Sequence, residues 1–227
     1  SYAYADAALA LLAAAWGHAA DAERLRQRAA GWHALYDGDG WPRGRRADGS
    51  WESHDPFRWG GPFVEGNAWH YLWAPVHDIA GLVDRLGGPA GLGDRLDAFF
   101  GAPATVRVGT YGRRIHEMNE MEADGFGQYA HGNQPSHHVP YLYNYSDRPW
   151  KTAALVRRIG DELYSARPSG YAGDEDTGSL GSWYVFSALG LYPLRPGSPV
   201  YALGAPRFRQ TEVDIGQGVR IEARGIE

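Results

Sequence analysis

GDEDTGSLGSWYVFSALG, residues 173–190, is the stretch that decides how this chain is built. It opens with three consecutive carboxylates at 174–176, enclosed by glycines, and continues as an apolar run of helix length. Neither lysine nor arginine occurs between Arg167 and Arg195, so the crowded carboxylates require a shared proton, a cation or a basic partner. A polar loop that leads into a core helix indicates a helical domain with its chemistry in the loops.

The same alternation of helix and polar loop recurs along the chain. Apolar spacing and capping signals predict helices over residues 2–16 (buried), 21–36, 67–73, 79–86, 94–100, 150–164 and 178–189. Residues 37–63 are rich in Gly, Pro and Trp and predict a long ordered loop, which in compact domains is usually functional. After Gly197 the period becomes that of strands, over 200–203, 210–215 and 219–223. The fold class expected is mainly α over residues 1–196, followed by β from 197 to 227.

Composition excludes several functional classes. The chain has 227 residues, 44% of them hydrophobic and 22% charged, which is typical of a globular protein. Its net charge of −5 and the absence of a basic block longer than 43–46 argue against nucleic-acid binding. With no cysteine, there can be no disulfide, thiolate zinc site or thiol nucleophile. The longest apolar stretch, 7–15, is too short to span a membrane, and any targeting sequence is expected upstream. The 9 Trp and 14 Tyr suit core packing and sugar stacking equally well.

The first polar loop with a candidate role surrounds Glu65. Phe63, Val64 and Trp69 flank it, so partial desolvation is expected to raise the pKa of its carboxyl, as a general acid requires. The alternative is a first-turn glutamate that only favours the helix dipole.

A second loop, residues 131–138, holds three histidines and two carboxamides. The spacing of the histidines lacks the i, i+4 pair of a helical zinc site, whereas the amide oxygens suit a hard cation such as calcium. His137 and His138 could also bond sugar hydroxyls, although polar residues that cap a helix would look the same.

Two further loops complete the set of candidates. In extended backbone, Asp174 and Asp176 point the same way, so one could take a proton from water while the other holds that water; the alternative is a solvated cap. The loop that contains Arg43 and Trp51 is either a binding rim or an ordinary turn-rich loop. An acid, a base pair and an amide/histidine loop on separate elements describe a site for a polyhydroxyl substrate.

At this level of detail the motifs resemble a known family, glycoside hydrolase family 92. The resemblance covers nearly the whole chain, in order and spacing, through the runs 65–69, 131–138, 141–145 with 149–152, and 173–176 with 183–193. It implies a calcium-dependent, inverting, exo-acting α-mannosidase. It also implies that residues 1–196 form the second half of an (α/α)6 toroid and that 197–227 begin the returning strands of a β-sandwich. The N-terminal domain of the same polypeptide would be missing, so this chain alone is expected to be inactive.

The resemblance assigns roles residue by residue. Glu65 matches the general acid, and Asp174 and Asp176 match the pair that supplies the base. Contacts with a mannose-containing oligosaccharide, such as an N-glycan or mannan, are expected from Trp69, His70, His131, His137, His138, Arg43 and Trp51. Asn133 and Gln134 are the candidates for the calcium environment. Gln134 departs from the family, which commonly has glutamate there, and so removes one negative charge.

Other hypotheses stay open at this level. The chain could belong to a carbohydrate-binding or inactive relative, or to another (α/α)6 glycosidase or lyase. A secreted or periplasmic location is expected, and linkage specificity is not determined by these residues.

Overall fold

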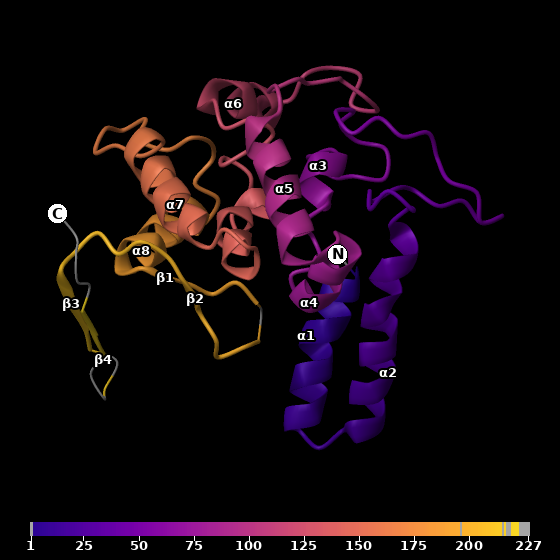
Figure 1. The fold of residues 1–227 in the computed structure, drawn as a ribbon, viewed down its shortest axis with the longest axis horizontal. Coiled ribbons are helices and arrows are strands. Elements are labelled where there is room, and N and C mark those ends of the chain that lie inside the picture. The colour runs from indigo at the N-terminus through magenta and orange to yellow at the C-terminus, as the bar shows by residue number, and fades with distance from the viewer. Residues whose placement is uncertain (1, 196, 215, 217–218, 223–227) are drawn as a thin grey trace.

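The structure is a computed structural model that describes residues 2–195, 197–214, 216 and 219–222. It is mainly helical, with short antiparallel strands near the C-terminus (Figure 1). The α-helices are α1 (Tyr2–Ala15), α2 (Ala19–Ala29), α3 (Ala68–Tyr71), α4 (Ile79–Arg85), α5 (Gly88–Gly101), α6 (His116–Asp124), α7 (Trp150–Glu162) and α8 (Ser179–Leu189). The 3-10 helices are η1 (Ala30–Leu35), η2 (Gln134–Ser136) and η3 (Val139–Tyr145), and the strands are β1 (Leu191–Tyr192), β2 (Ala202–Leu203), β3 (Gln210–Val213) and β4 (Val219–Glu222). Within these described ranges, no helix has the length and apolarity needed to cross a membrane.

Apolar spacing and capping residues in the sequence predicted the positions of most helices correctly. The helix expected over 21–36 is α2 followed by the 3-10 turn η1, and the one over 67–73 is the short α3. Asp78 caps α4, accepting a hydrogen bond from the Gly81 N–H at 3.0 Å. The helix expected at 94–100 is longer, because Gly87 adopts φ +92° and Pro89 occupies the first turn, so α5 begins at Gly88. The sequence interpretation missed α6, whose Met118 and Met121 lie three apart and are fully buried.

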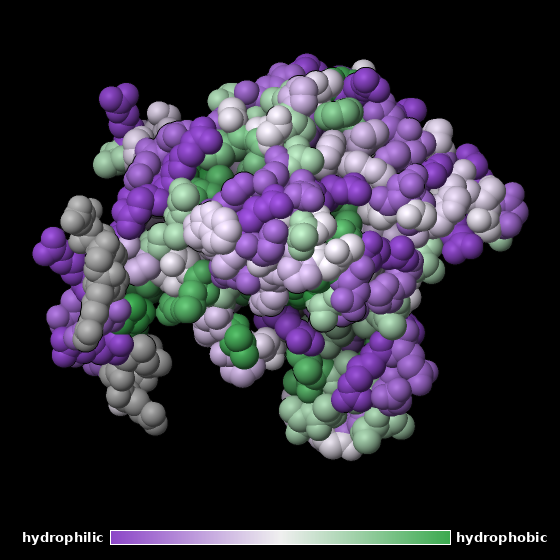
Figure 2. Space-filling model, viewed as in Figure 1, coloured by the Kyte–Doolittle hydropathy of each residue, from purple (hydrophilic) through white to green (hydrophobic). Residues whose placement is uncertain are grey.

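The helical hairpin of α1 and α2 projects from the rest of the molecule (Figure 1). The expectation that α1 is buried was wrong for the described residues, because only Asp6 and Ala10 are buried. Leu9, Leu12 and Trp16 are 50%, 44% and 70% exposed, and apolar surface is visible on this hairpin (Figure 2). Alanine and leucine favour the helical conformation of α1. Within the described residues, however, only a narrow side of this helix packs against other elements.

The core joins α5, α7, α8 and η3. Leu92, Leu96 and Phe99 of α5 are fully buried at helical spacing and pack with Ile159 of α7 and Trp183 of α8. A smaller cluster contains Trp59, Met118, Met121 and Ala130. The two clusters lie beneath the polar loops and hold them in place.

The strands are shorter than expected. β1 pairs with β2 through Leu191↔Leu203 and Tyr192↔Ala202, and β3 pairs with β4 from Gln210↔Glu222 to Val213↔Val219. Residues 215 and 223, which the sequence included in strands, lie outside the described residues. The loop over 37–63 is confirmed as a long irregular segment, pinned by hydrogen bonds from Trp59 N to Arg107 O at 3.0 Å and from Arg107 N to Phe57 O at 3.1 Å.

A network of partly buried ion pairs and hydrogen bonds joins α5 to the start of α7. Asp97 accepts hydrogen bonds from Tyr143 Oη (2.6 Å), Arg148 Nη1 (2.7 Å) and Lys151 Nζ (2.6 Å). Burial works against the charge of Asp97, but the three donors outweigh it and lower the pKa of this carboxyl. The network therefore stabilises the fold only while Asp97 is ionised.

We expect Asp97→Asn to lower the free energy of unfolding by about 1–2 kcal/mol at pH 7, an estimate reduced for solvent screening. Because the folded pKa is depressed, the contribution is present above the unfolded pKa of about 3.9 and is lost as pH falls through the folded value. Denaturant unfolding at pH 7 and near pH 2.5 measures this, and the variant and the parent should converge at the lower pH. An equal gap at both values would contradict the assignment.

Candidate active site

Glu65 lies in a tightly held turn that precedes α3. Its backbone adopts φ +49°, its N–H donates to Tyr111 Oη at 2.6 Å, and its carbonyl accepts from Asn133 Nδ2 at 2.8 Å. Asn67 then caps α3 in a reciprocal pair with His70: Asn67 Oδ1 accepts from the His70 N–H (3.3 Å), and His70 Nδ1 accepts from the Asn67 N–H (3.0 Å). The backbone of Glu65 is thus fixed from both sides.

The side chain of Glu65, however, is exposed. The expected desolvation by its neighbours is not found in this chain, because Val64 is itself 66% exposed and Trp69 is buried in the core. The segment changes from exposed residues at Val64 and Glu65 to buried residues from Gly66 onward, so the apolar neighbours do not enclose the carboxyl between them.

The loop over 131–138 connects this turn to the acidic loop. Asn133 is 5% exposed and donates to the Glu65 carbonyl, while the amide nitrogen of Gln134 donates to the Asp176 carboxylate. Pro135 lies in the first turn of η2. Two adjacent carboxamides therefore reach the two segments that the sequence assigned to acid and base.

The histidines of this loop have structural positions, which corrects the prediction that His131 and His137 bind sugar. His131 is fully buried, with Nδ1 2.7 Å from Tyr129 Oη and Nε2 2.6 Å from Tyr164 Oη. His137 is 5% exposed, with Nε2 2.9 Å from the His131 carbonyl. Burial holds the pKa of His131 well below its ordinary value and lowers that of His137 to about 4, so both are neutral at pH 7. Both ring nitrogens of His131 are bonded inside the protein, and His137 is buried with its Nε2 bonded to the backbone, so neither position suits contact with a sugar.

His138 differs from its neighbours because it reaches a cavity. Its Nε2 lies 2.8 Å from the Trp73 carbonyl, and burial lowers its pKa to about 4. The cavity has a volume of about 550 Å³ and brings together residues from α1, the Glu65 turn, the 131–138 loop and β1. Its polar lining includes Tyr4, Glu65, His70, Tyr71, Asn133, Gln134, His138 and Tyr192. This cavity is the candidate active site, with Glu65, His70, His138, Asn133 and Gln134 at its wall.

The three carboxylates of the acidic loop have different partners. Glu175 turns back onto α8, where it accepts hydrogen bonds from the N–H groups of Gly178 and Gly181, the latter at 3.0 Å. Asp176 adopts φ +51° and accepts from Gln134. The Asp174 side chain is 73% exposed and lies 4.0 Å from His116 Nε2. The expectation of two aspartates pointing the same way from extended backbone was wrong, because Asp176 and Thr177 take left-handed conformations.

The other predicted sugar contacts lie elsewhere. Trp69 is 8% exposed and packs edge-on against Trp41, with ring centroids 4.6 Å apart. This burial removes Trp69 from the candidate sugar contacts. Arg43 forms an ion pair with Asp37 at 3.2 Å, and its guanidinium lies 5.7 Å from the Trp51 ring.

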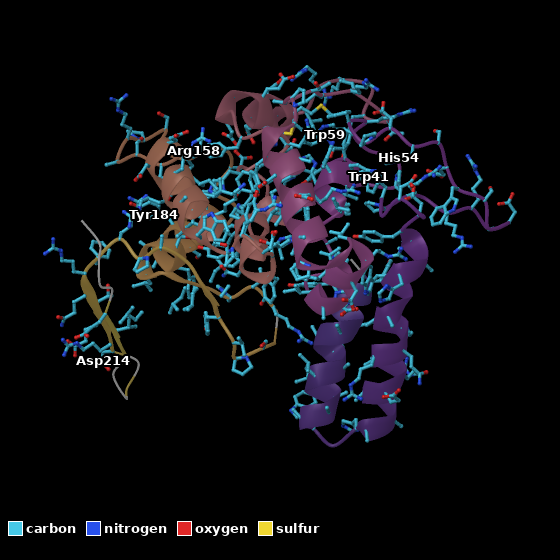
Figure 3. All side chains as sticks on the ribbon, in the orientation of Figure 1. Trp41, His54, Trp59, Arg158, Tyr184 and Asp214 are labelled. Carbon is cyan, nitrogen blue, oxygen red and sulfur yellow. The ribbon has the colours of Figure 1, made fainter. Side chains whose placement is uncertain are left out.

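The loop that carries Arg43 also contains Trp41 and His54, whose rings lie close together (Figure 3). Arg43 lines a separate cavity of about 220 Å³ in this loop. The described chain therefore does not bring Arg43 or Trp51 to the wall of the Glu65 cavity.

Sequence reasoning missed three residues that support the site. Tyr71 Oη donates to the Val64 carbonyl at 2.8 Å, Tyr111 holds Glu65, and His116 faces Asp174. The spacing of His116 and Glu120, four apart on α6, indicates their contact with each other but not the contact with Asp174. The basic partner required by the crowded carboxylates is thus a histidine from a distant helix.

Comparison with known proteins identifies the relatives of this chain. A family described as the glycosyl hydrolase family 92 catalytic domain matches residues 1–226. An uncharacterized secreted glycosidase of Arthroderma benhamiae is 24% identical over 93% of this chain and 27% of its own length.

Solved structures agree with this result. A family 92 inverting mannosidase from Bacteroides thetaiotaomicron is 43% identical, with a TM-score of 0.82, over 100% of this chain and 31% of that protein. A family 92 α-mannosidase from the same organism, in complex with mannoimidazole, is 31% identical with a TM-score of 0.84, over 97% of this chain and 29% of that protein. The chain therefore spans about a third or less of the length of these relatives.

We expect Glu175→Ala to lower the free energy of unfolding by about 1–2 kcal/mol, because it leaves two N–H groups at the start of α8 without their acceptor. Glu162→Ala on the exposed face of α7 is the matched control, and it should change stability by no more than about 0.5 kcal/mol. Denaturant unfolding followed by tryptophan fluorescence measures both. Equal effects of the two substitutions would show that Glu175 is not the cap.

Proposed function

Since the chain belongs to glycosyl hydrolase family 92, we propose that it is the part of an inverting, exo-acting α-mannosidase that carries the general acid and the general base. Glu65 would protonate the leaving oxygen, and the pair Asp174 and Asp176 would supply the base that activates water. One observation carries the proposal: adjacent amides of Asn133 and Gln134 hold the Glu65 backbone and the Asp176 carboxylate. The substrate would be a terminal mannose of an N-glycan or mannan.

This arrangement suits a single-displacement hydrolysis. Inversion requires an acid on one side of the sugar and a base on the other, about 6.5–9.5 Å apart, with a water between base and anomeric carbon. The proposal is supported by the placement of acid and base on separate loops, with a third loop that bonds the Glu65 backbone and the Asp176 carboxylate. A sugar seated in the cavity would exclude water from the exposed Glu65 and favour its protonated form.

Backbone conformation gives independent support. Among the described non-glycine residues, those with positive φ are Glu65, Asp176 and Thr177. Such conformations cost about 1–3 kcal/mol each and persist where the surroundings impose them, commonly at active sites. Two of the three are residues to which we assign proton transfer.

Calcium is the cofactor that we propose for this site. Asn133 and Gln134 both donate through their amide nitrogens, so their amide oxygens are the atoms left for a cation. Oxygen donors of this kind suit calcium, although no group of three or more His, Asp or Glu side chains in the described ranges could hold a metal. The residues fit the ion in kind and would need further oxygens from the substrate or the rest of the protein. Calcium held by the amide oxygens of Asn133 and Gln134 would supply a Lewis acid for the hydroxyl groups of the bound mannose.

The surrounding architecture is part of the same proposal. Residues 1–196 would complete an (α/α)6 toroid with helices from the remainder of the polypeptide, and 197–227 would begin strands of a β-sandwich. The exposed apolar side of α1 supports a fragment that needs this remainder, so the chain alone is expected to be inactive. Secretion is proposed by analogy with the relative described as secreted.

We expect the full-length protein to hydrolyse α-linked mannobiosides and to lose at least about 90% of that activity in EDTA, with recovery on adding calcium. Mannose release from α-1,2, α-1,3 and α-1,6 mannobiosides, with and without EDTA, measures this and determines the linkage. Activity that EDTA does not change would remove calcium from the proposal. A reaction on a uronic acid substrate instead, or no reaction on any α-mannoside, would refute the proposed mannosidase activity.

We expect Glu65→Gln in the full-length enzyme to reduce kcat for the preferred mannobioside by about 10²–10⁴-fold, since no proton reaches the leaving sugar. Dinitrophenyl α-mannoside needs no such proton, so its kcat should fall less than about tenfold. Glu162→Gln on α7 is the matched control and should leave both rates unchanged. Equal losses on the two substrates would contradict the role of general acid.

A further inference from the structure

His116, at the start of α6, lies between carboxylates from two elements. Its Nδ1 is 2.9 Å from Glu120 Oε1, and its Nε2 is 3.3 Å from Glu117 Oε1 and 4.0 Å from Asp174 Oδ2. Glu117 and Glu120 belong to α6 itself, whereas Asp174 belongs to the acidic loop. The imidazole therefore bridges this helix to the segment that carries the proposed base.

Glu120 also touches the loop on the other side. A Cβ added at either Gly132 or Gly173 would lie 2.7 Å from Glu120 Oε2, and a Cβ at Gly173 would lie 2.7 Å from the Gly132 Cα. The backbones of the 131–138 loop and the acidic loop are thus in contact, and the Glu120 carboxylate packs against both loops where they meet. Only glycine permits this approach.

We propose that His116 is a positioning residue of the hydrolysis, which together with Glu120 holds the acidic loop against the 131–138 loop so that its aspartates face the attacking water. The inference rests on the proposed function and assigns to it residues outside the acid and base. The acidic loop has no lysine or arginine of its own, so an imidazolium from α6 is the charge that faces Asp174. Gln134 holds Asp176 from the opposite side.

We call the contact of His116 and Glu120 with the acidic loop the clamp. The charge of His116 decides whether the clamp holds. The hydrogen bond to Glu120, with the nearby charges of Glu117 and Asp174, raises the pKa of His116 despite some desolvation. Farther along α6, partial burial raises the pKa of Asp124 to about 7. The attraction is complete below the unfolded pKa of His116 and is lost as pH rises through the raised folded value. Above that value, Asp174 faces carboxylates with no cation between them.

The kinetic test uses the full-length enzyme and dinitrophenyl α-mannoside, whose departure does not depend on the general acid. His116→Gln and Glu120→Gln should lower kcat by about tenfold to a hundredfold, with KM changed less than about twofold, because a displaced base affects the transition state and not ground-state binding. His116→Lys keeps a positive charge, so it should retain more than about half of kcat and shift the alkaline fall of kcat to higher pH. Glu122→Gln, on the same helix but paired with Arg114, is the matched control and should match the wild type.

Hydrogen exchange of the peptide over 171–178 gives a second readout that does not need activity. Exchange should be faster in His116→Gln and Glu120→Gln than in the wild type, and unchanged in Glu122→Gln. The proposal is overturned if exchange of this peptide does not change, if kcat is retained although exchange is faster, or if His116→Lys and His116→Gln have the same pH profile. A wild type that hydrolyses no α-mannoside would refute the proposed function, and the exchange measurement would still decide whether the clamp exists.

Discussion

The candidate site depends on a pair of hydrogen bonds, by which the adjacent carboxamides of Asn133 and Gln134 join the two segments on either side of them. Asn133 is buried and bonds the backbone of Glu65, and Gln134 bonds the side chain of Asp176. Neighbouring residues cannot move independently, so these two bonds couple the positions of the proposed acid and base. The buried His131 and Tyr129, together with the partly buried Tyr164, anchor this loop. Misplacement of reacting groups by about 1 Å can cost a hundredfold in rate, which gives this coupling its value.

The burial of His131 and His137 is therefore part of the site and not a loss to it. An imidazole held neutral between two tyrosine hydroxyls is a rigid spacer with both ring nitrogens satisfied. Trp183 of α8 adds a third constraint, because its Nε1 donates to the His137 carbonyl at 3.0 Å. The apolar helix that follows the acidic loop thus also fixes the amide loop. The acidic loop, α8 and the histidines therefore belong to one packing unit.

Local patterns predicted much of the fold because helices such as α4, α7 and α8 follow from spacing and caps within one segment. The predictions that were wrong concern burial and contacts, which depend on other segments of the chain. Glu65 has apolar neighbours in sequence yet is exposed, and His131 lies in a polar loop yet is fully buried. The α1 helix has the composition of a core helix, but a core requires partners that the described residues do not supply. The His116 contact with Asp174 joins residues 58 positions apart, and no periodicity can indicate it.

The glutamine at 134 changes the electrostatics of this site in a definite way. A carboxamide can donate to Asp176, so the contact is attractive without any ion. A glutamate at 134 would place two carboxylates in contact, and one of them would have to hold a proton or share a cation. The choice of side chain at 134 is therefore coupled to the charge of whatever occupies the space between the loops. With glutamine, the hydrogen bond to Asp176 keeps this carboxylate in place, and no cation is needed to relieve repulsion between the two side chains.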